Sequence, residues 1–210
     1  ARQELETSQR YLNSARDSVN SLLRFFAESR KSRGVAQGTT TEAERDLLRA
    51  SIVFAGAGLD AVLKQLIRDA LPALVHKGVV DAEEGLLRFT QRLVADPKQN
   101  AAALLADDSK QYLMDNYIYE LTGSSLQSRE QVKAVASALG IHDRALASEI
   151  DGLGELFEAR NQISHELDLQ DVKRHGIKKR RSRDRPQTAE LTDKAFAVGQ
   201  LFIDRVDGLL

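Results

Sequence analysis

Apolar residues recur at three- and four-residue intervals along most of the chain. Between Gln3 and Lys31 this spacing is that of one face of an α-helix, so we expect a long amphipathic helix there. Thr41 and Glu44 stand at capping-box spacing, which is typical of a helix start. This second helix should end at about residue 71, because a proline follows and disfavours a helical residue before it. Its middle, Ala50 to Leu63, is apolar on every side, as in a helix enclosed by its neighbours.

Shorter segments with the helical period fill the rest of the chain. The spacing predicts helices over 81–95, 98–105, 109–121, 128–139, 144–167 and 188–209, bounded by glycine, proline and capping residues. We therefore predict an all-α fold, an up-and-down bundle of long helices in a single domain over residues 1–210. Residues 73–140 are expected to form an irregular insertion of shorter helices, and residues 172–187 a basic loop.

The composition narrows the chemistry that the chain can perform. It contains no cysteine, which excludes disulfides, thiolate metal sites, iron–sulfur clusters and cysteine nucleophiles. A hydrophobic fraction of 42% with 29% charged residues is typical of a soluble globular protein. The run from Ala50 to Leu63 is too short to span a bilayer, and no secretory segment is visible. We expect a cytoplasmic protein that does not act at a membrane.

Positive charge is concentrated in one place although the net charge is only −1. Eight of the 30 basic residues lie between Val172 and Pro186, the basic stretch, against a single acid, Asp184. A polyanion would be attracted to this stretch, although a solvated loop of ordinary composition is the alternative. The eight basic residues are Lys173, Arg174, Lys178, Lys179, Arg180, Arg181, Arg183 and Arg185.

Two familiar kinds of site are not supported. The glycines of Ser51 to Ala61 imitate a dinucleotide-binding fingerprint, but that motif needs a strand before it, whereas here a capped helix runs through it. Gly56 and Gly58 are better interpreted as points of close helix contact. The four histidines are scattered and do not show metal-ligand spacing, so we expect no metal and no cofactor. Asp60, in an otherwise apolar helix, must be paired or lie on a functional surface.

One segment carries a more specific combination of side chains, Arg160-Asn161-Gln-Ile-Ser-His165. At about 100° per residue, Asn161 and His165 share a helix face, whereas Arg160 and His165 are roughly 140° apart. Arginine can hold a phosphate through two hydrogen bonds, and histidine can move protons near neutral pH. These are the groups needed to cleave a phosphodiester without a metal. From the residues alone, a surface pair or a core salt bridge remains an alternative.

This motif resembles that of HEPN domains, all-α proteins in which an arginine, often followed by a polar residue, precedes a histidine by four to six positions. Its place on a late helix that one more long helix follows is also similar. Ala50 to Leu66 resembles the central helix of the RiboL-PSP-HEPN branch, where Asp60 would be the acidic residue. Residues 73–140 carry no such resemblance.

The resemblance implies a metal-independent endoribonuclease that acts as a homodimer, with the motif helices of two protomers in one cleft. His165 would act as general acid or base, Arg160 would stabilise phosphate charge, Asn161 would orient His165 or the substrate, and Asp60 would pair with Arg160 or position the groove. RNA would be cut through its 2′-OH to leave a 2′,3′-cyclic phosphate.

The resemblance further implies a toxin–antitoxin or phage-defence setting, with an antitoxin or other regulatory protein as partner. The basic stretch would follow the RNA backbone, without aromatic residues for base stacking. The competing hypotheses are a non-catalytic HEPN-like module for dimerisation or nucleotide binding, and a helical regulator that binds nucleic acid through the basic stretch.

Overall fold

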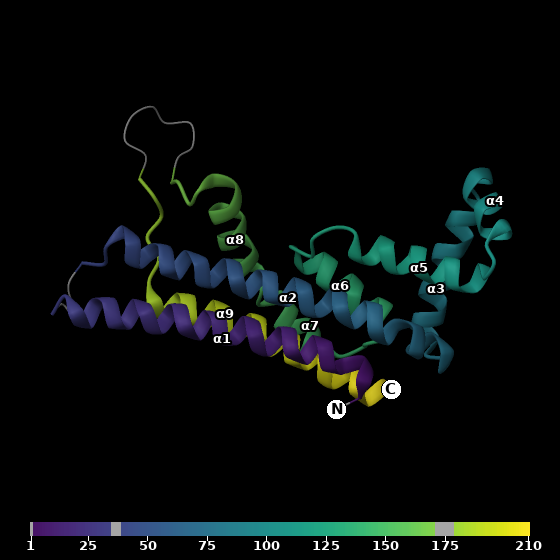
Figure 1. The fold of residues 1–210 in the computed structure, drawn as a ribbon, viewed down its shortest axis with the longest axis horizontal. Coiled ribbons are helices and arrows are strands. Elements are labelled where there is room, and N and C mark those ends of the chain that lie inside the picture. The colour runs from purple at the N-terminus through teal and green to yellow at the C-terminus, as the bar shows by residue number, and fades with distance from the viewer. Residues whose placement is uncertain (1, 35–38, 171–178) are drawn as a thin grey trace.

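Three long helices form the body of the protein. The computed structural model describes residues 2–34, 39–170 and 179–210, and this part of the chain is helical apart from turns and one isolated β-bridge. α1 (Gln3–Ser32), α2 (Glu42–His76) and α9 (Arg185–Leu209) lie side by side, with both chain termini at the same end (Figure 1). The predicted all-α bundle is therefore confirmed.

Small residues bring these helices close together. A Cβ atom at Gly58 of α2 would overlap the side chain of Ala15 in α1, and one at Gly199 of α9 would lie 2.9 Å from Leu12 Cδ1. The surrounding core contains fully buried side chains of all three helices, including Leu59 and Phe202. The expected close helix contact is confirmed at Gly58, whereas Gly56 faces the side chain of Arg160.

The start of α2 is capped as predicted. The Thr41 hydroxyl accepts a hydrogen bond from the Glu44 backbone N–H at 3.2 Å, and the Glu44 carboxylate accepts one from the Thr41 N–H at 2.9 Å. The predicted end at residue 71 is wrong, because α2 continues through Pro72 to His76. A proline removes only one backbone hydrogen bond, and the complete burial of Leu71 and Leu74 holds the last turns in place.

α2 is also the one described helix that is long and apolar enough to cross a membrane by composition. The core helix of a soluble protein has the same composition, and 56% of the apolar window is buried inside this protein. Its apolar surface is thus largely used for packing against α1, α9 and α8.

The shorter helices gather beyond one end of the bundle. α3 (Val80–Val94), α4 (Pro97–Leu105) and α5 (Ser109–Thr122) form a lobe there, and α6 (Arg129–Ala138) leads back along α2 (Figure 1). Phe89 and Tyr117 stack within the lobe at a ring-centroid distance of 5.2 Å. This region is the irregular helical insertion that the sequence predicts.

The segment predicted as one helix over 144–167 is two helices instead. α7 (Arg144–Asp151) and α8 (Gly154–Glu166) are separated at Gly152 and Leu153. Glycine favours such a break because it is a poor helix former, and Leu153, which follows it, is completely buried.

The basic loop predicted over 172–187 is also shorter than expected. α9 already begins at Arg185, because Asp184 caps its N-terminus and proline is well tolerated in a first helical turn. Before α9, Leu169 and Arg180 form an antiparallel bridge, which joins the two described ends of the loop.

Candidate active site on α8

α8 carries the Arg160–His165 motif and stands against the middle of α2 (Figure 1). Its inner face is apolar, with Leu156, Phe157 and Ala159 buried. Arg160 lies at the edge of this face, where its Cδ is 3.0 Å from the position of a Cβ atom at Gly56. Gly56 therefore provides the space that the arginine occupies.

The Arg160 guanidinium is unsatisfied within the described part of the chain. Its Nε and Nη1 atoms are buried and have no hydrogen-bond partner there. A buried donor without a partner costs about 1–3 kcal/mol, and more when it is charged. An anion or a second protein surface at this point would remove that cost.

Asp60 does not pair with Arg160, so this expected role is corrected. Its Oδ1 accepts a 2.7 Å hydrogen bond from the Leu126 backbone N–H, and its Oδ2 lies 3.1 Å from Lys64 Nζ. Asp60 thus fastens the segment between α5 and α6 to α2. Its carboxylate is held by these two partners instead of by the motif arginine.

Asn161 and His165 lie on the solvent side of α8. Both are exposed, and no hydrogen bond or ion pair joins either side chain to another described residue. They share a face, while Arg160 lies roughly 140° from His165 around the helix. One protomer therefore leaves the histidine accessible but does not direct it and the arginine to the same point.

A buried carboxylate fixes the end of α8. Leu167 and Asp168 both adopt the left-handed conformation, with φ of 51° and 60°, which is costly for residues other than glycine. Asp168 is completely buried. Its Oδ2 accepts from Arg49 Nε of α2 at 2.8 Å, and its Oδ1 accepts from Arg183 Nη2 at 2.6 Å. These three residues form the Asp168 clamp.

The clamp affects the pKa of Asp168 and fixes the position of the end of α8. Burial by itself raises the pKa of the Asp168 carboxyl, but the hydrogen bonds and charges of Arg183 and Arg49 outweigh it and hold this pKa below the ordinary value. Arg183 also donates to Gln162 Oε1 on α8 at 2.9 Å. The clamp therefore joins α2, α8 and the segment that precedes α9.

The described part of the basic stretch is not a uniform cationic surface. Lys173, Arg174 and Lys178 lie outside the described residues. Arg183 is buried in the clamp, so the expectation that it faces RNA is wrong. Arg180 pairs with Asp46 at 2.7 Å, and Arg181 pairs with Glu166 at 3.1 Å. Lys179 and Arg185 are the exposed described members.

An apolar stripe lies on α2, the helix against which α8 packs. Ala50, Phe54, Ala57 and Ala61 fall within about 60° of one another on a 100° helical wheel and form the α2 stripe. Phe54 is 49% exposed, Ala57 is exposed, and the other two are half-buried. An exposed phenylalanine in an apolar row is typical of an interaction surface.

Sequence reasoning missed the clamp and the stripe. Arg49 flanks the apolar run of α2, and a charged residue at that point is a weak signal of a buried pair. Phe54 belongs to a helix that is apolar on every side, so its exposure had no sequence signal.

Two further observations concern metal binding and similarity to known proteins. Among the residues that the structure describes, no group of three or more histidine and acidic side chains is arranged to hold a metal ion. Comparisons of the chain with protein-family models, with curated proteins and with solved structures find no match.

Proposed function

We propose that the protein is a metal-independent endoribonuclease whose active site is built from the α8 helices of two copies. The observation that supports this proposal most directly is that side chains of the motif have no partner in the described structure. His165 and Asn161 are exposed and have no partner in the described structure, and the neighbouring Arg160 keeps two buried guanidinium nitrogens unsatisfied. Buried polar groups are normally hydrogen-bonded, so the two unsatisfied nitrogens of Arg160 favour a partner or ligand beyond the described structure.

A second copy is part of the proposal for two reasons. Cleavage through the 2′-OH needs a base for the hydroxyl and an acid for the leaving 5′-oxygen, and each protomer offers one motif histidine. Arg160 and His165 also point in different directions on α8. Two antiparallel copies of α8 would bring the arginine of one protomer near the histidine of its partner.

The α2 stripe supports the pairing of two copies. It places exposed Phe54 on the helix against which α8 packs. A stable interface buries about 1,600 Å² in total, so α8 and the stripe together would have to contribute on both protomers. Leu167, at the end of α8, is a further exposed apolar side chain.

The chemistry follows from these groups. One His165 takes the proton of the ribose 2′-OH, which attacks the adjacent phosphorus. The other His165 protonates the departing 5′-oxygen. Arg160 stabilises the charge that develops on the phosphate, and Asn161 orients the histidine or the substrate. The products are a 2′,3′-cyclic phosphate and a 5′-OH, in a toxin–antitoxin or phage-defence setting with a regulatory partner.

The test is RNA cleavage in excess EDTA by the purified full chain, with analysis of the fragment ends. We expect cyclic phosphate ends from the wild type. His165→Ala should lose about 10²–10⁴-fold in rate, and Arg160→Ala about 10²–10³-fold. His142→Ala is the matched control, because His142 is exposed and pairs with Asp81 on α3, away from α8. Equal rates for His165→Ala and wild type would reject the proposal.

A non-catalytic RNA-binding module is the second candidate. It is favoured by the lack of convergence between Arg160 and His165 within one protomer. For this candidate, RNA binds to a dimeric wild type without any cleavage, and His165→Ala leaves the affinity unchanged.

A further inference from the structure

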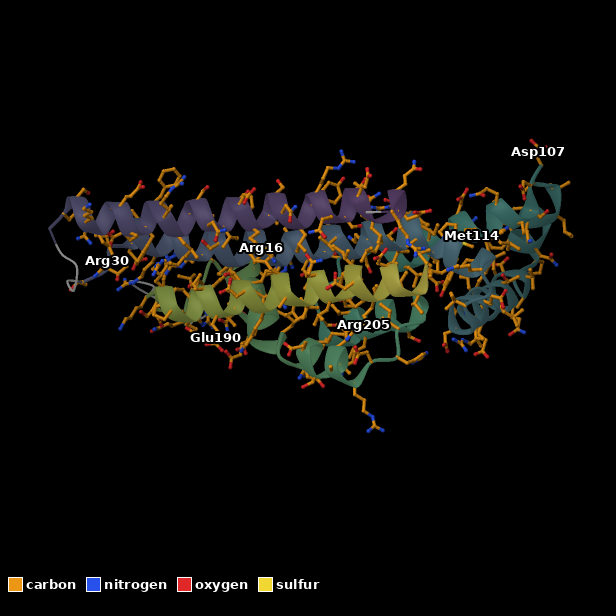
Figure 2. The ribbon with its side chains drawn as sticks, turned by 90° about the horizontal axis from the view of Figure 1, so that it is seen from below. Arg16, Arg30, Asp107, Met114, Glu190 and Arg205 are labelled. Carbon is orange, nitrogen blue, oxygen red and sulfur yellow. The ribbon has the colours of Figure 1, made fainter. Side chains whose placement is uncertain are left out.

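A cavity of about 450 Å³ lies where α1 ends and α9 begins. Its lining consists of Phe26, Ala27, Arg30, Lys31, Gly34 and Arg185. Three of these residues are basic, and none is acidic. Figure 2 shows Arg30 at this end of the bundle, between the last turns of α1 and the first turn of α9. We call this cavity the α1–α9 pocket.

The basic side chains of the pocket differ in how they are held. Arg30 is fixed in place, because its Nη1 donates to Thr40 Oγ1 at 3.0 Å and its guanidinium lies 5.8 Å from the centroid of the Phe26 ring. Lys31 and Arg185 are exposed, and neither has an ion pair or a hydrogen bond with another described residue. The pocket thus combines a preset guanidinium with two cations that are available to a ligand.

The carboxylates near the pocket are engaged by groups other than Lys31 and Arg185. Glu44 is buried, accepts hydrogen bonds from Arg33, Ser29 and the Thr41 backbone, and pairs with Arg30, whose Nη1 lies 3.9 Å from Glu44 Oε2. Asp184 accepts from the Gln187 N–H as the cap of α9, so this helix terminus is already satisfied. The positive charge of Lys31 and Arg185 is therefore not neutralised by the surrounding protein.

We propose that the α1–α9 pocket binds a phosphate group of a polynucleotide, separately from the motif on α8. Lysine and arginine together match the charge and the acceptor oxygens of a phosphate. The volume admits a whole nucleotide, and the exposed Ala27 side chain offers an apolar contact to its sugar or base. Arg185 is the last basic residue of the basic stretch and also lines the pocket. An RNA strand bound along the stretch can therefore extend into the pocket. This proposal does not depend on cleavage at His165.

The test measures RNA affinity at low salt, with the whole chain carrying His165→Ala so that the RNA is not cut. The probe is an RNA labelled with fluorescein at its 3′ end, and it is used once with a 5′-OH and once with a 5′-phosphate. Lys31→Ala and Arg185→Ala should each weaken binding by about tenfold. Arg24→Ala is the matched control, because Arg24 lies on α1 outside the pocket and is exposed. A preference for the 5′-phosphate form assigns the pocket to a terminal phosphate, and equal affinity assigns it to an internal phosphodiester.

A variant that fills the pocket without changing the net charge shows whether RNA binds inside the pocket or is only attracted by the positive charge around it. Ala27→Trp should weaken RNA binding by about the same factor as Arg185→Ala. Asn20→Trp, two turns earlier on the same face of α1, should bind as the parent does. Circular dichroism verifies that both variants are folded.

The proposal is overturned if Ala27→Trp binds like the parent, or if Arg24→Ala weakens binding as much as Arg185→Ala. Competition by inorganic phosphate equal to that by RNA would indicate a free-phosphate site and would also overturn it. Binding is measured in the His165→Ala background, so the result does not require cleavage. An inactive wild type would therefore reject the proposed function and leave this result standing.

Discussion

Two glycines on α2 lie only two residues apart but have different partners. Gly58 faces Ala15 of α1, where an added methyl group would have no room, whereas Gly56 faces the flexible side chain of Arg160. The first glycine permits a helix contact of the core. The second permits the position of a motif residue. Substitution by alanine should therefore separate stability from activity.

We expect Gly58→Ala to lower the free energy of unfolding by about 1–3 kcal/mol, because overpacking forces the helices apart. Gly56→Ala should change it by less than about 1 kcal/mol, since an arginine side chain can move aside, but it should reduce RNA cleavage as Arg160 is displaced. Urea unfolding and the cleavage assay measure the two effects. A stable and fully active Gly58→Ala protein would contradict this assignment.

Residue types with strong local geometry were predictable, and contacts between distant helices were not. Thr41 and Glu44 form their capping box within one turn, so four residues of sequence contain the whole interaction. Asp60 was expected to pair with Arg160 or to position the groove, and its partners are Lys64 and the Leu126 N–H instead of Arg160. That choice depends on the rotation of α8 relative to α2, which no local pattern specifies.

At the scale of elements, the end of α8 depends on the Asp168 clamp. Two consecutive left-handed residues are unfavourable, and the buried bonds of Asp168 to Arg49 and Arg183 offset that cost. Removing one partner of a buried ion pair leaves uncompensated charge and typically costs about 3–5 kcal/mol. Asp168→Ala should lower the unfolding free energy by this amount, whereas exposed Asp193→Ala should have little effect.

The clamp also predicts a pH dependence. Because the folded-state pKa of Asp168 is depressed, the unfolded state binds more protons as the pH falls. The stabilisation is fully present above the unfolded pKa of about 4, and it is lost as the pH falls through the folded pKa. Urea unfolding between pH 7 and pH 3 should show a smaller loss for Asp168→Ala than for wild type. An equal loss of unfolding free energy with falling pH in the two proteins would contradict this role of the clamp.

Element boundaries show the same division between local and distant causes. Asp184 and Ser128 cap their helices by accepting a backbone N–H from three residues later. The start of α6 falls close to its predicted position, whereas α9 begins at Arg185 instead of the predicted residue 188. The continuation of α2 past Pro72 and the break at Gly152 are decided by burial of Leu71, Leu74 and Leu153. Burial by other helices was not visible in the sequence.

At the scale of the whole molecule, the proposed active site requires two copies to meet at α8 and the α2 stripe. Phe54→Glu introduces a charge into this surface and should shift the protein from dimer to monomer in analytical ultracentrifugation. Cleavage should fall in parallel, because the site would be divided. Phe54 is already half exposed, so the monomer should stay folded.

Leu87→Glu provides the matched control on the α3–α5 lobe, where Leu87 is exposed to a similar extent, 55% against 49% for Phe54. It should remain dimeric and active. If Leu87→Glu separates the copies and Phe54→Glu does not, the interface lies on the lobe and the proposed composite site is wrong.

The most direct test of the proposed cleavage concerns the attacking 2′-hydroxyl. In excess EDTA, the wild-type chain is given an RNA whose cleavage position has been mapped, beside the same RNA with a single 2′-deoxy sugar at that position. We expect cleavage of the first RNA only, and no cleavage of either by His165→Ala. Cleavage at the 2′-deoxy position, or cleavage that survives the loss of His165, would contradict the proposed mechanism.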